Sequence, residues 1–235
     1  MSGLTLVFWI ALPYVAMTVF VVGHAWRWRH DQFGWTSRSS QLMERRLLSV
    51  GSPLFHYGAF AAIGGHVLGI LIPESWTAAL GITETEYHWL SALAGTAAGL
   101  AVVVGFAILL YRRITVPRVA VTTTRMDIAV YALLTLTIGL GMLETAGVNL
   151  LGGGYDYRST VAVWFRGLFL ANPQPELMVS APLVYQLHVV SAWLLFALWP
   201  FSRLVHAWSY PLLYLGRPWI LYRGYRARAA ERSAR

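Results

Sequence analysis

The segment that decides the fold is SPLFHYGAFAAIGGHVLGILIP, residues 52–73, an apolar run without formal charge that carries two histidines, His56 and His66. A helix of about 20 apolar residues crosses the roughly 30 Å hydrocarbon core of a bilayer, so this segment is long enough to span one. An ionisable side chain at such depth is costly and is a functional candidate by default. The segment therefore predicts a transmembrane helix with two imidazoles available for chemistry.

The whole chain has the composition of an integral membrane protein. Of its 235 residues, 57% are hydrophobic and 12% are charged, and the mean hydropathy is +0.55. Apolar segments of spanning length occur near residues 4–25, 53–72, 89–111, 127–148 and 183–205. We therefore expect an all-α fold of five transmembrane helices in a single membrane domain over residues 1–235.

The basic residues show how the chain should lie in the membrane. The formal net charge of +8 comes from arginine alone, because the chain contains no lysine. Most arginines lie in the connections 26–52 and 112–126 and in the tail from residue 203 onward. By the positive-inside rule these segments face the cytoplasm. We expect a multi-pass protein of the cell (inner or plasma) membrane, with an outer N-terminus and a cytoplasmic C-terminus, and no nucleic-acid partner.

Residue usage limits the kind of redox centre that the chain can hold. It has no cysteine, which excludes a cysteine-ligated iron–sulfur cluster and a thioether-attached haem within this chain. Any metal centre must therefore use other ligands. Of the seven histidines, His24, His30 and His88 flank predicted spans, and we interpret them as interfacial residues.

The other four histidines fall into two pairs once the topology is applied. The second span runs outward and the fifth runs inward, so His66 lies with His188 towards the outer face. By the same reasoning His56 lies with His206 towards the inner face. Two imidazoles from facing helices are the axial ligands of a b-type haem, so this pattern favours two haems stacked across a di-haem helical bundle.

Helix geometry supports this pairing only in part. The histidines of the fifth span are 18 residues apart and those of the second span are 10 apart, which in straight helices gives rises of about 27 Å and about 15 Å. Helix tilt, or distortion near Gly64, Gly65 or Pro200, would absorb the difference. Small residues around Gly65 suit either the approach of a porphyrin or close helix packing. Spacing alone leaves open two haems, one haem, or haem-free structural or proton-relay histidines.

Several blocks of sequence resemble one known family in order and spacing. These blocks are WTSRSSQ (35–41), SPLFHYG (52–58), GHVLGILIPESW (65–76), RRITVPRVAVTTTRMD (112–127) and LHVVSAWLLFALWPFSRLVHAWSYPLLYL (187–215). Over nearly its whole length the chain resembles the cytochrome b (gamma) subunit of membrane-bound respiratory nitrate reductase. The four paired histidines stand where the family's haem ligands should be.

The resemblance implies two b-type haems, an outer one held by His66 and His188 and an inner one held by His56 and His206. It also implies that a quinol, expected to be menaquinol, is oxidised near the outer haem and that electrons pass inward. The partners would be an iron–sulfur subunit and a molybdenum catalytic subunit on the cytoplasmic face. Nitrate reduction itself would take place in the molybdenum subunit.

The expected quinol site departs from the family's pattern. Family members carry a lysine in the outward loop before the third span, whereas this chain offers Glu86, Tyr87 and His88 there. A quinol-oxidising site needs a group that accepts a proton, and a histidine or a carboxylate does this. We favour His88 over Tyr87, with Glu86 as a second acceptor; the alternative is that all are solvated loop residues.

Arginines near the inner haem also have more than one interpretation. Arg112, Arg113 and Arg203 suit haem propionates or a partner surface, because guanidinium groups recognise carboxylates. Alternatively they are ordinary positive-inside anchors. The TSRSSQLMERR loop (36–46) and the arginine-rich tail suit docking of the partner subunits, although acidic lipid headgroups would attract the same charges.

Other functional classes remain open from the sequence. One is a di-haem b subunit of another respiratory enzyme, such as a hydrogenase or a formate dehydrogenase. A second is a haem-free transporter or proton channel that uses its intramembrane histidines as a relay. A third is a membrane anchor in which the histidines have only a structural role.

Overall fold

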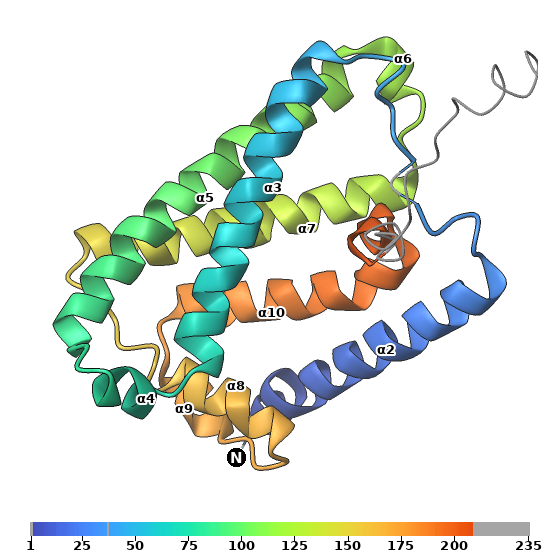
Figure 1. Cartoon of the computed structure of the whole chain (residues 1–235). Helices are drawn as coiled ribbons and strands as arrows, with labels where there is room; N and C mark the ends of the chain where they lie inside the picture. The colour runs from blue at the N-terminus through green and yellow to red at the C-terminus, as the bar shows by residue number, and fades with distance from the viewer. Residues whose placement is uncertain (1, 37, 209–235) are drawn as a thin grey trace, which may run out of the picture.

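The computed structural model describes residues 2–36 and 38–208, and within them the protein is helical with no strand (Figure 1). Five helical stretches are long and apolar enough to cross a membrane: Gly3–His30, Arg46–Leu71, Glu84–Thr115, Arg125–Leu151 and Leu183–Phe201. The predicted all-helical fold with five spanning helices is confirmed. At most 28% of any apolar span window is buried inside the protein, so most of each helix surface is left for lipid.

Several spanning stretches change helix type along their length. The first comprises α1 (Gly3–Leu6), η1 (Val7–Ala11, a π-helix) and α2 (Leu12–His30). The second comprises α3 (Arg46–His66) and the π-helix η2 (Val67–Leu71). The third is α5 (Glu84–Thr115), and the fourth comprises α7 (Arg125–Met142) and the π-helix η3 (Leu143–Leu151). The fifth comprises α10 (Leu183–Leu198) and the 3₁₀ turn η4 (Trp199–Phe201).

Short helices lie in the connections between the spans. These are α4 (Glu74–Ala79), α6 (Pro117–Ala120), α8 (Val161–Phe169), α9 (Pro175–Ser180) and the 3₁₀ turn η5 (Arg203–Ala207). Helix α8 packs into the protein, where the buried Trp164 donates its indole N–H to the Trp9 carbonyl at 2.9 Å. This hydrogen bond attaches the long connection between the fourth and fifth spans to the first span.

Local capping sets where two spans begin. Helix α5 begins at Glu84, five residues before the predicted position, because Thr83 and Glu86 form a reciprocal capping box. Helix α7 begins at Arg125 with the same arrangement, in which Thr124 caps the helix and Asp127 returns the bond. Capping residues are polar, so hydropathy alone places these helix starts too late.

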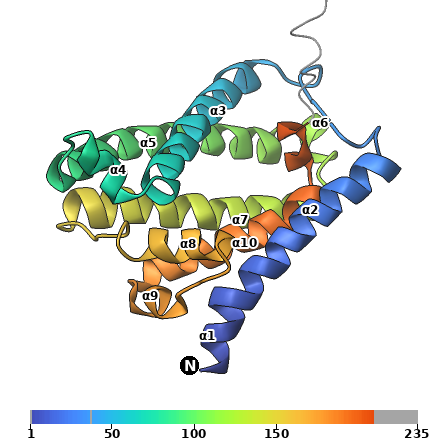
Figure 2. The same cartoon turned by 60° about the horizontal axis from the view of Figure 1, so that its bottom comes forward.

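The helices form two groups that meet along α5 (Figure 2). Helix α3 packs along α5, and α10 packs between α7 and α2. The α3–α5 contact is a close approach of backbones, because a Cβ added at Gly58 would lie 2.8 Å from the Val102 nitrogen and 2.9 Å from the Ala98 oxygen. Two helices far apart in sequence, α3 and α10, thereby lie in one bundle.

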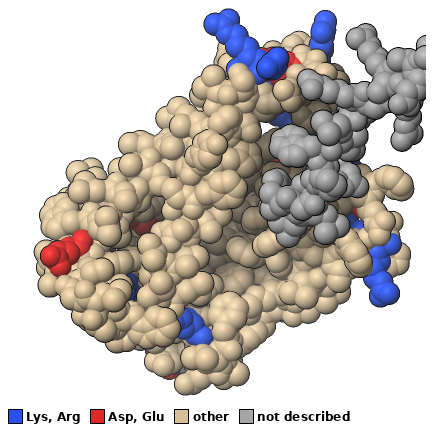
Figure 3. Space-filling view, viewed as in Figure 1, with Lys and Arg blue, Asp and Glu red and all other residues tan. Residues whose placement is uncertain are grey.

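Charged side chains mark the two ends of the bundle. We call the end that holds the starts of α3 and α7 and the end of α10 the basic end, and the other the opposite end. In Figure 3, most blue side chains stand at the upper and right-hand edges, with red atoms beside them at the top, while a red group stands at the left and a smaller blue group near the bottom; tan residues cover most of the surface between them. This distribution is typical of a protein whose middle contacts lipid.

The fifth span ends earlier than predicted. Helix α10 stops at Leu198, and after η4 the backbone is extended at Ser202, with φ −112° and ψ −178°. The predicted span 183–205 is therefore not one regular helix, and the break lies beside Pro200, where distortion was expected. Gly64 and Gly65 stay helical, and the irregularity of the second span follows them in η2.

Candidate functional site

The structure brings four histidines together as two pairs. At the opposite end, the ring centroids of His66 and His188 lie 6.2 Å apart with an interplanar angle of 24°. At the basic end, those of His56 and His206 lie 5.9 Å apart at 70°. We call these the opposite-end pair and the basic-end pair. Each pair takes one ring from α3 and one from α10 or the η5 turn that follows it.

The ring separations suit a metal held between two imidazoles. A metal–nitrogen bond of about 2.0 Å puts each ring centroid about 3 Å from the metal, so two opposed rings have centroids about 6 Å apart. Among the described residues, no group of three or more His, Asp or Glu side chains is placed to hold a metal ion. A haem needs only two axial protein ligands, because its porphyrin supplies the others.

A backbone hydrogen bond orients each of the four imidazoles. The Nδ1 contacts are His56 to Ser52 O at 2.7 Å, His66 to Ala62 O at 2.7 Å, His188 to Thr137 O at 3.0 Å and His206 to Arg203 O at 2.6 Å. A carbonyl oxygen only accepts, so Nδ1 donates and Nε2 is the nitrogen with a lone pair. Metal-bound histidines are commonly fixed in this way. His24 and His30 make the same bond, so the bond sets the tautomer but does not by itself select the ligands.

Glycine residues lie on both sides of the opposite-end pair, one in α3 and one in α7. A Cβ added at Gly65 would meet no heavy atom within 4 Å, whereas one at Gly141 would lie 3.0 Å from Cε1 of His188. The α7 backbone therefore holds the His188 ring closely, and the α3 backbone at Gly65 faces open space. A flat ring system has room to approach α3 there.

Glu86 has a structural partner in the loop before the third span. Its carboxylate accepts the Thr83 N–H at 2.9 Å and the Thr83 hydroxyl at 2.8 Å. These bonds form the helix cap described above. The carboxylate is thereby held at the surface of the opposite end.

Tyr87 and His88 face the connection that follows η3. Tyr87 is buried, its hydroxyl lies 3.4 Å from that of Tyr157, and the Arg158 guanidinium sits 3.9 Å above its ring. His88 is half-buried, and a Cβ added at Gly154 would lie 2.8 Å from its Cε1. Tyr87 and His88 thus share one loop surface with residues 152–160.

At the basic end, Arg112 binds the loop that precedes α3. Its guanidinium donates to Glu44 Oε2 at 2.6 Å, to the Ser40 hydroxyl at 2.9 Å and to both backbone carbonyls. Burial raises the pKa of Glu44, but hydrogen bonds from the Leu47 N–H and from Arg112 outweigh it and hold the pKa below its ordinary value. This ion pair fixes the loop on the end of α5.

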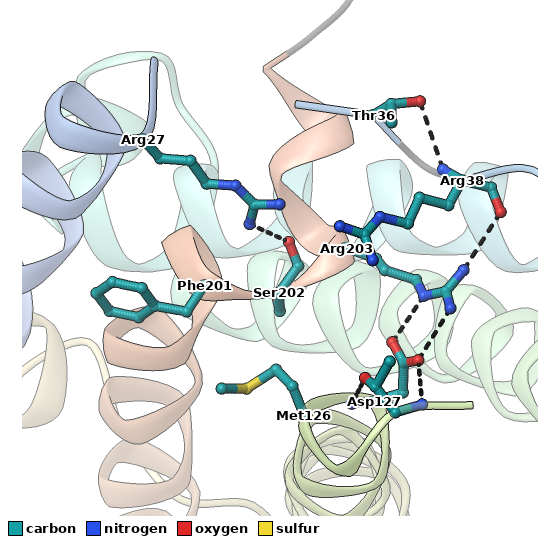
Figure 4. Close-up of a pocket in the computed structure, with 9 residues that line it drawn as sticks. Arg27, Thr36, Arg38, Met126, Asp127, Phe201, Ser202 and Arg203 are labelled. Atoms are coloured by element: carbon teal, nitrogen blue, oxygen red, sulfur yellow. Dashed lines mark hydrogen bonds and ion pairs between the residues drawn. The ribbon is translucent and has the colours of Figure 1, made fainter. Parts of the chain in front are cut away.

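Arg203 and Arg27 hold the break in the fifth span (Figure 4). Arg203 forms a bidentate ion pair with Asp127 at 2.7 and 3.0 Å. The buried Arg27 donates to the carbonyls of Pro200, at 2.7 Å, and Ser202, at 2.9 Å. Both arginines line a cavity of about 40 Å³, too small for a haem.

The arginines expected near the inner haem therefore have protein partners. Arg113 donates to the Thr122 hydroxyl at 2.9 Å and lies over the Tyr131 ring. Contact of Arg112 or Arg203 with a haem propionate stays a prediction. The arginine-rich tail beyond Trp208, expected to help dock a partner, lies outside the described residues.

Glu144 is a further candidate that sequence reasoning missed. It lies in η3 within the fourth span, and its Oε1 is buried without a hydrogen-bond partner. The signal in the sequence is the one carboxyl in the stretch 128–148, which is otherwise without formal charge and leads towards the opposite end. A single acid hardly lowers the hydropathy of such a segment, so the span itself was still found.

Comparison with known proteins gives one consistent family. Residues 5–225 match the family model of the nitrate reductase gamma subunit. The nitrate reductase gamma chain of Bacillus subtilis is 46% identical over 95% of this chain and 99% of its own length. The respiratory nitrate reductase 1 gamma chain of Escherichia coli is 32% identical over 95% of this chain and 99% of its own. The nitrate reductase-like protein NarX of Mycobacterium tuberculosis is 49% identical over 92% of this chain, which spans only about a third (33%) of that relative.

Proposed function

Because the chain belongs to the nitrate reductase gamma subunit family, we propose that it is the di-haem cytochrome b membrane subunit of a respiratory nitrate reductase. In this proposal the opposite end faces outward and the basic end faces the cytoplasm. The opposite-end pair holds the outer haem and the basic-end pair holds the inner haem. Quinol is oxidised at the outer side, and an iron–sulfur subunit at the inner side receives the electrons for a molybdenum subunit.

The paired imidazoles are the observation that carries the proposal. Both pairs have the ring separation of two axial ligands, 6.2 and 5.9 Å, and all four Nδ1 atoms contact carbonyl oxygens. A haem-free relay has no need for two pairs at this spacing. A bound haem would supply the one-electron chemistry that joins the two faces.

The protein's own residues orient the ligands and limit their motion. Thr137 and Gly141 of α7 hold the His188 ring from the side of the neighbouring helix. The carbonyl of Arg203, whose guanidinium binds Asp127, accepts from His206. His188 and His206 therefore rest on segments fixed by a second interaction, as a site needing constant geometry requires.

Quinol oxidation also requires groups that take protons. We propose His88 as one acceptor, because it is half-buried beside the loop 152–160 at the same end as the outer pair. The Glu86 carboxylate is held in the helix cap, so we give it a smaller role than His88 in accepting protons. Two electrons that pass inward while two protons leave outside move charge across the membrane, against about 2.3 kcal/mol per charge at 100 mV.

The test is a count of haems per chain by pyridine haemochrome assay, combined with the spectrum of the dithionite-reduced protein. We expect two b-type haems per chain in the unmodified protein, and one in either His66→Ala or His56→Ala. The control His30→Ala, on an exposed ring outside both pairs, retains both haems. A colourless protein would overturn the proposal, and so would variants of the paired histidines that keep two haems.

The partner is tested separately. Purification of the tagged chain from nitrate-respiring cells should bring down a molybdenum-containing protein that reduces nitrate with quinol as electron donor. Recovery of a hydrogenase or a formate dehydrogenase instead would assign the chain to another respiratory complex.

A further inference from the structure

Glu144 lies one helical turn from the part of α7 that holds His188. Gly141 faces the His188 ring, and a position three residues later lies on nearly the same side of a helix, about one turn further on. The π-helix η3 begins at Leu143, next to Glu144.

The environment of this carboxyl marks it as more than a packing residue. Its Oε1 is buried and has no hydrogen-bond partner. A charged or unpaired polar group inside a membrane protein is costly, so it is retained where it has a use.

A hydrogen-bonded cluster lies close to Glu144. Tyr185, one turn before His188 on α10, interacts electrostatically with the Glu144 carboxyl. The Asn149 amide donates to the Tyr185 oxygen at 2.9 Å, and the Tyr155 N–H donates to Asn149 Oδ1 at 3.0 Å. These bonds hold Tyr185 in place beside the carboxyl.

We propose that Glu144 is a proton-exchange group for quinol oxidation. This inference rests on the proposed function. Oxidation of a quinol breaks two O–H bonds, and it leaves two protons when the two electrons pass on. Glu144 takes one of these protons on its carboxyl oxygen and gives it up again before the next turnover.

Other titratable groups near this end set the background for the test. They are His188 and Tyr185 on α10, His88 on α5, Tyr155 and Tyr157 in the loop, and the exposed carboxylates of Glu84, Glu86, Asp156 and Glu176. Only the carboxylates give a carbonyl band when they are protonated. A band that is lost in Glu144→Gln but kept in Glu176→Gln therefore belongs to Glu144.

The experiment uses the Glu144→Gln variant in the intact membrane enzyme, since glutamine keeps the shape but cannot carry the proton. We expect dithionite-reducible haem to stay at two per chain and quinol-driven haem reduction to slow by about 10-fold or more. The infrared difference between oxidised and reduced protein should lose a carboxylic carbonyl band. Glu144→Asp keeps an exchangeable proton and should recover part of the rate. The control Glu176→Gln, at an exposed carboxyl of the same end, should match the unmodified enzyme.

Three results would overturn this role of Glu144. These are an unchanged rate of haem reduction in Glu144→Gln, a retained carboxylic band, or loss of haem from that variant, which would make the residue structural. None of them contradicts the proposed function, which is tested by the haem counts of the unmodified chain and its histidine variants. The two proposals therefore fail separately.

Discussion

At the residue scale, a backbone carbonyl orients each of the paired imidazoles. His56 and His66 donate to the carbonyl four residues earlier in α3, at 2.7 Å in both cases. His188 instead uses Thr137 of the neighbouring α7, whose hydroxyl also donates to Ser191 of α10 at 3.0 Å. A ring held by a neighbouring helix depends on tertiary packing, which spacing along one helix does not reveal.

The open space beside Gly65 allows a test of the proposed outer haem in which both histidine ligands stay unchanged. We expect Gly65→Leu to lower the haem count from two to one per chain, because the leucine side chain occupies space beside His66 that a porphyrin needs. The measurement is the pyridine haemochrome assay together with a thermal melt. No heavy atom lies within 4 Å of a Cβ at this position, so the fold should remain intact.

Gly139→Leu is the matched control for this variant. Gly139 also has open space around an added Cβ, but it lies two residues from both Thr137 and Gly141, on the other side of α7. It should retain both haems. A Gly65→Leu protein that also kept two haems would show that no porphyrin lies against α3 there.

The Glu44 carboxylate gives a pH-dependent test at the basic end. Its pKa in the folded protein is below the ordinary value of 4.5, so its contribution to stability is present above that pH and is lost as the pH falls through the folded value. Thermal melts in detergent should show that Glu44→Gln is less stable than the unmodified protein at pH 7. The difference should shrink as the pH is lowered below 4.5. A difference independent of pH would mean that the charge is not what Arg112 recognises.

At the element scale, hydropathy predicted the existence and type of every span, but local chemistry decided where each one ends. Thr83 and Thr124 start their helices through side-chain bonds that a hydropathy window does not register. The fifth span breaks at Ser202, which resolves the unequal spacing of the histidines. A straight helix would separate His188 from His206 by about 27 Å, whereas the extended residue turns the chain and returns His206 to the ring of His56.

Close packing of α3 on α5 gives a prediction at this scale. Gly58→Ala places a methyl group 2.8 Å from backbone, so we expect the free energy of unfolding to fall by about 1–3 kcal/mol. Gly139→Ala, with no atom within 4 Å, should instead gain about 0.5–1 kcal/mol from helix propensity. Denaturation in detergent measures both changes. Equal effects for the two glycines would mean that α3 and α5 are not in backbone contact.

At the scale of the whole molecule, charge distribution carries the predicted orientation, and the absence of cysteine makes it testable. Single cysteines introduced at Ser159 and Ser39, both exposed and at different ends, report which side each end faces. We expect a membrane-impermeant thiol reagent to label Ser159→Cys in intact cells. Ser39→Cys should be labelled only after permeabilisation. The reverse pattern would invert the proposed orientation and the direction of electron flow.

The same scale shows what the sequence did not reveal about the site. The histidines were found because imidazoles in an apolar segment stand out, and arginines because they gather in connections. Glu144 was recognised as a candidate only from the structure. The structure shows that one of its carboxyl oxygens has no hydrogen-bond partner and that Tyr185, on another helix, interacts with it. The partners of Arg112 and Arg203 were also found only in the structure, because these arginines bind loop segments whose paths sequence patterns do not predict.

Each histidine pair is shared between α3 and the region of α10, and this sets an order for biosynthesis if the pairs hold haem as proposed. Neither haem could have both its ligands until the ribosome has made the fifth span and this span has met the second. Cofactor insertion would therefore be a late event, and a chain truncated before His188 would hold neither haem.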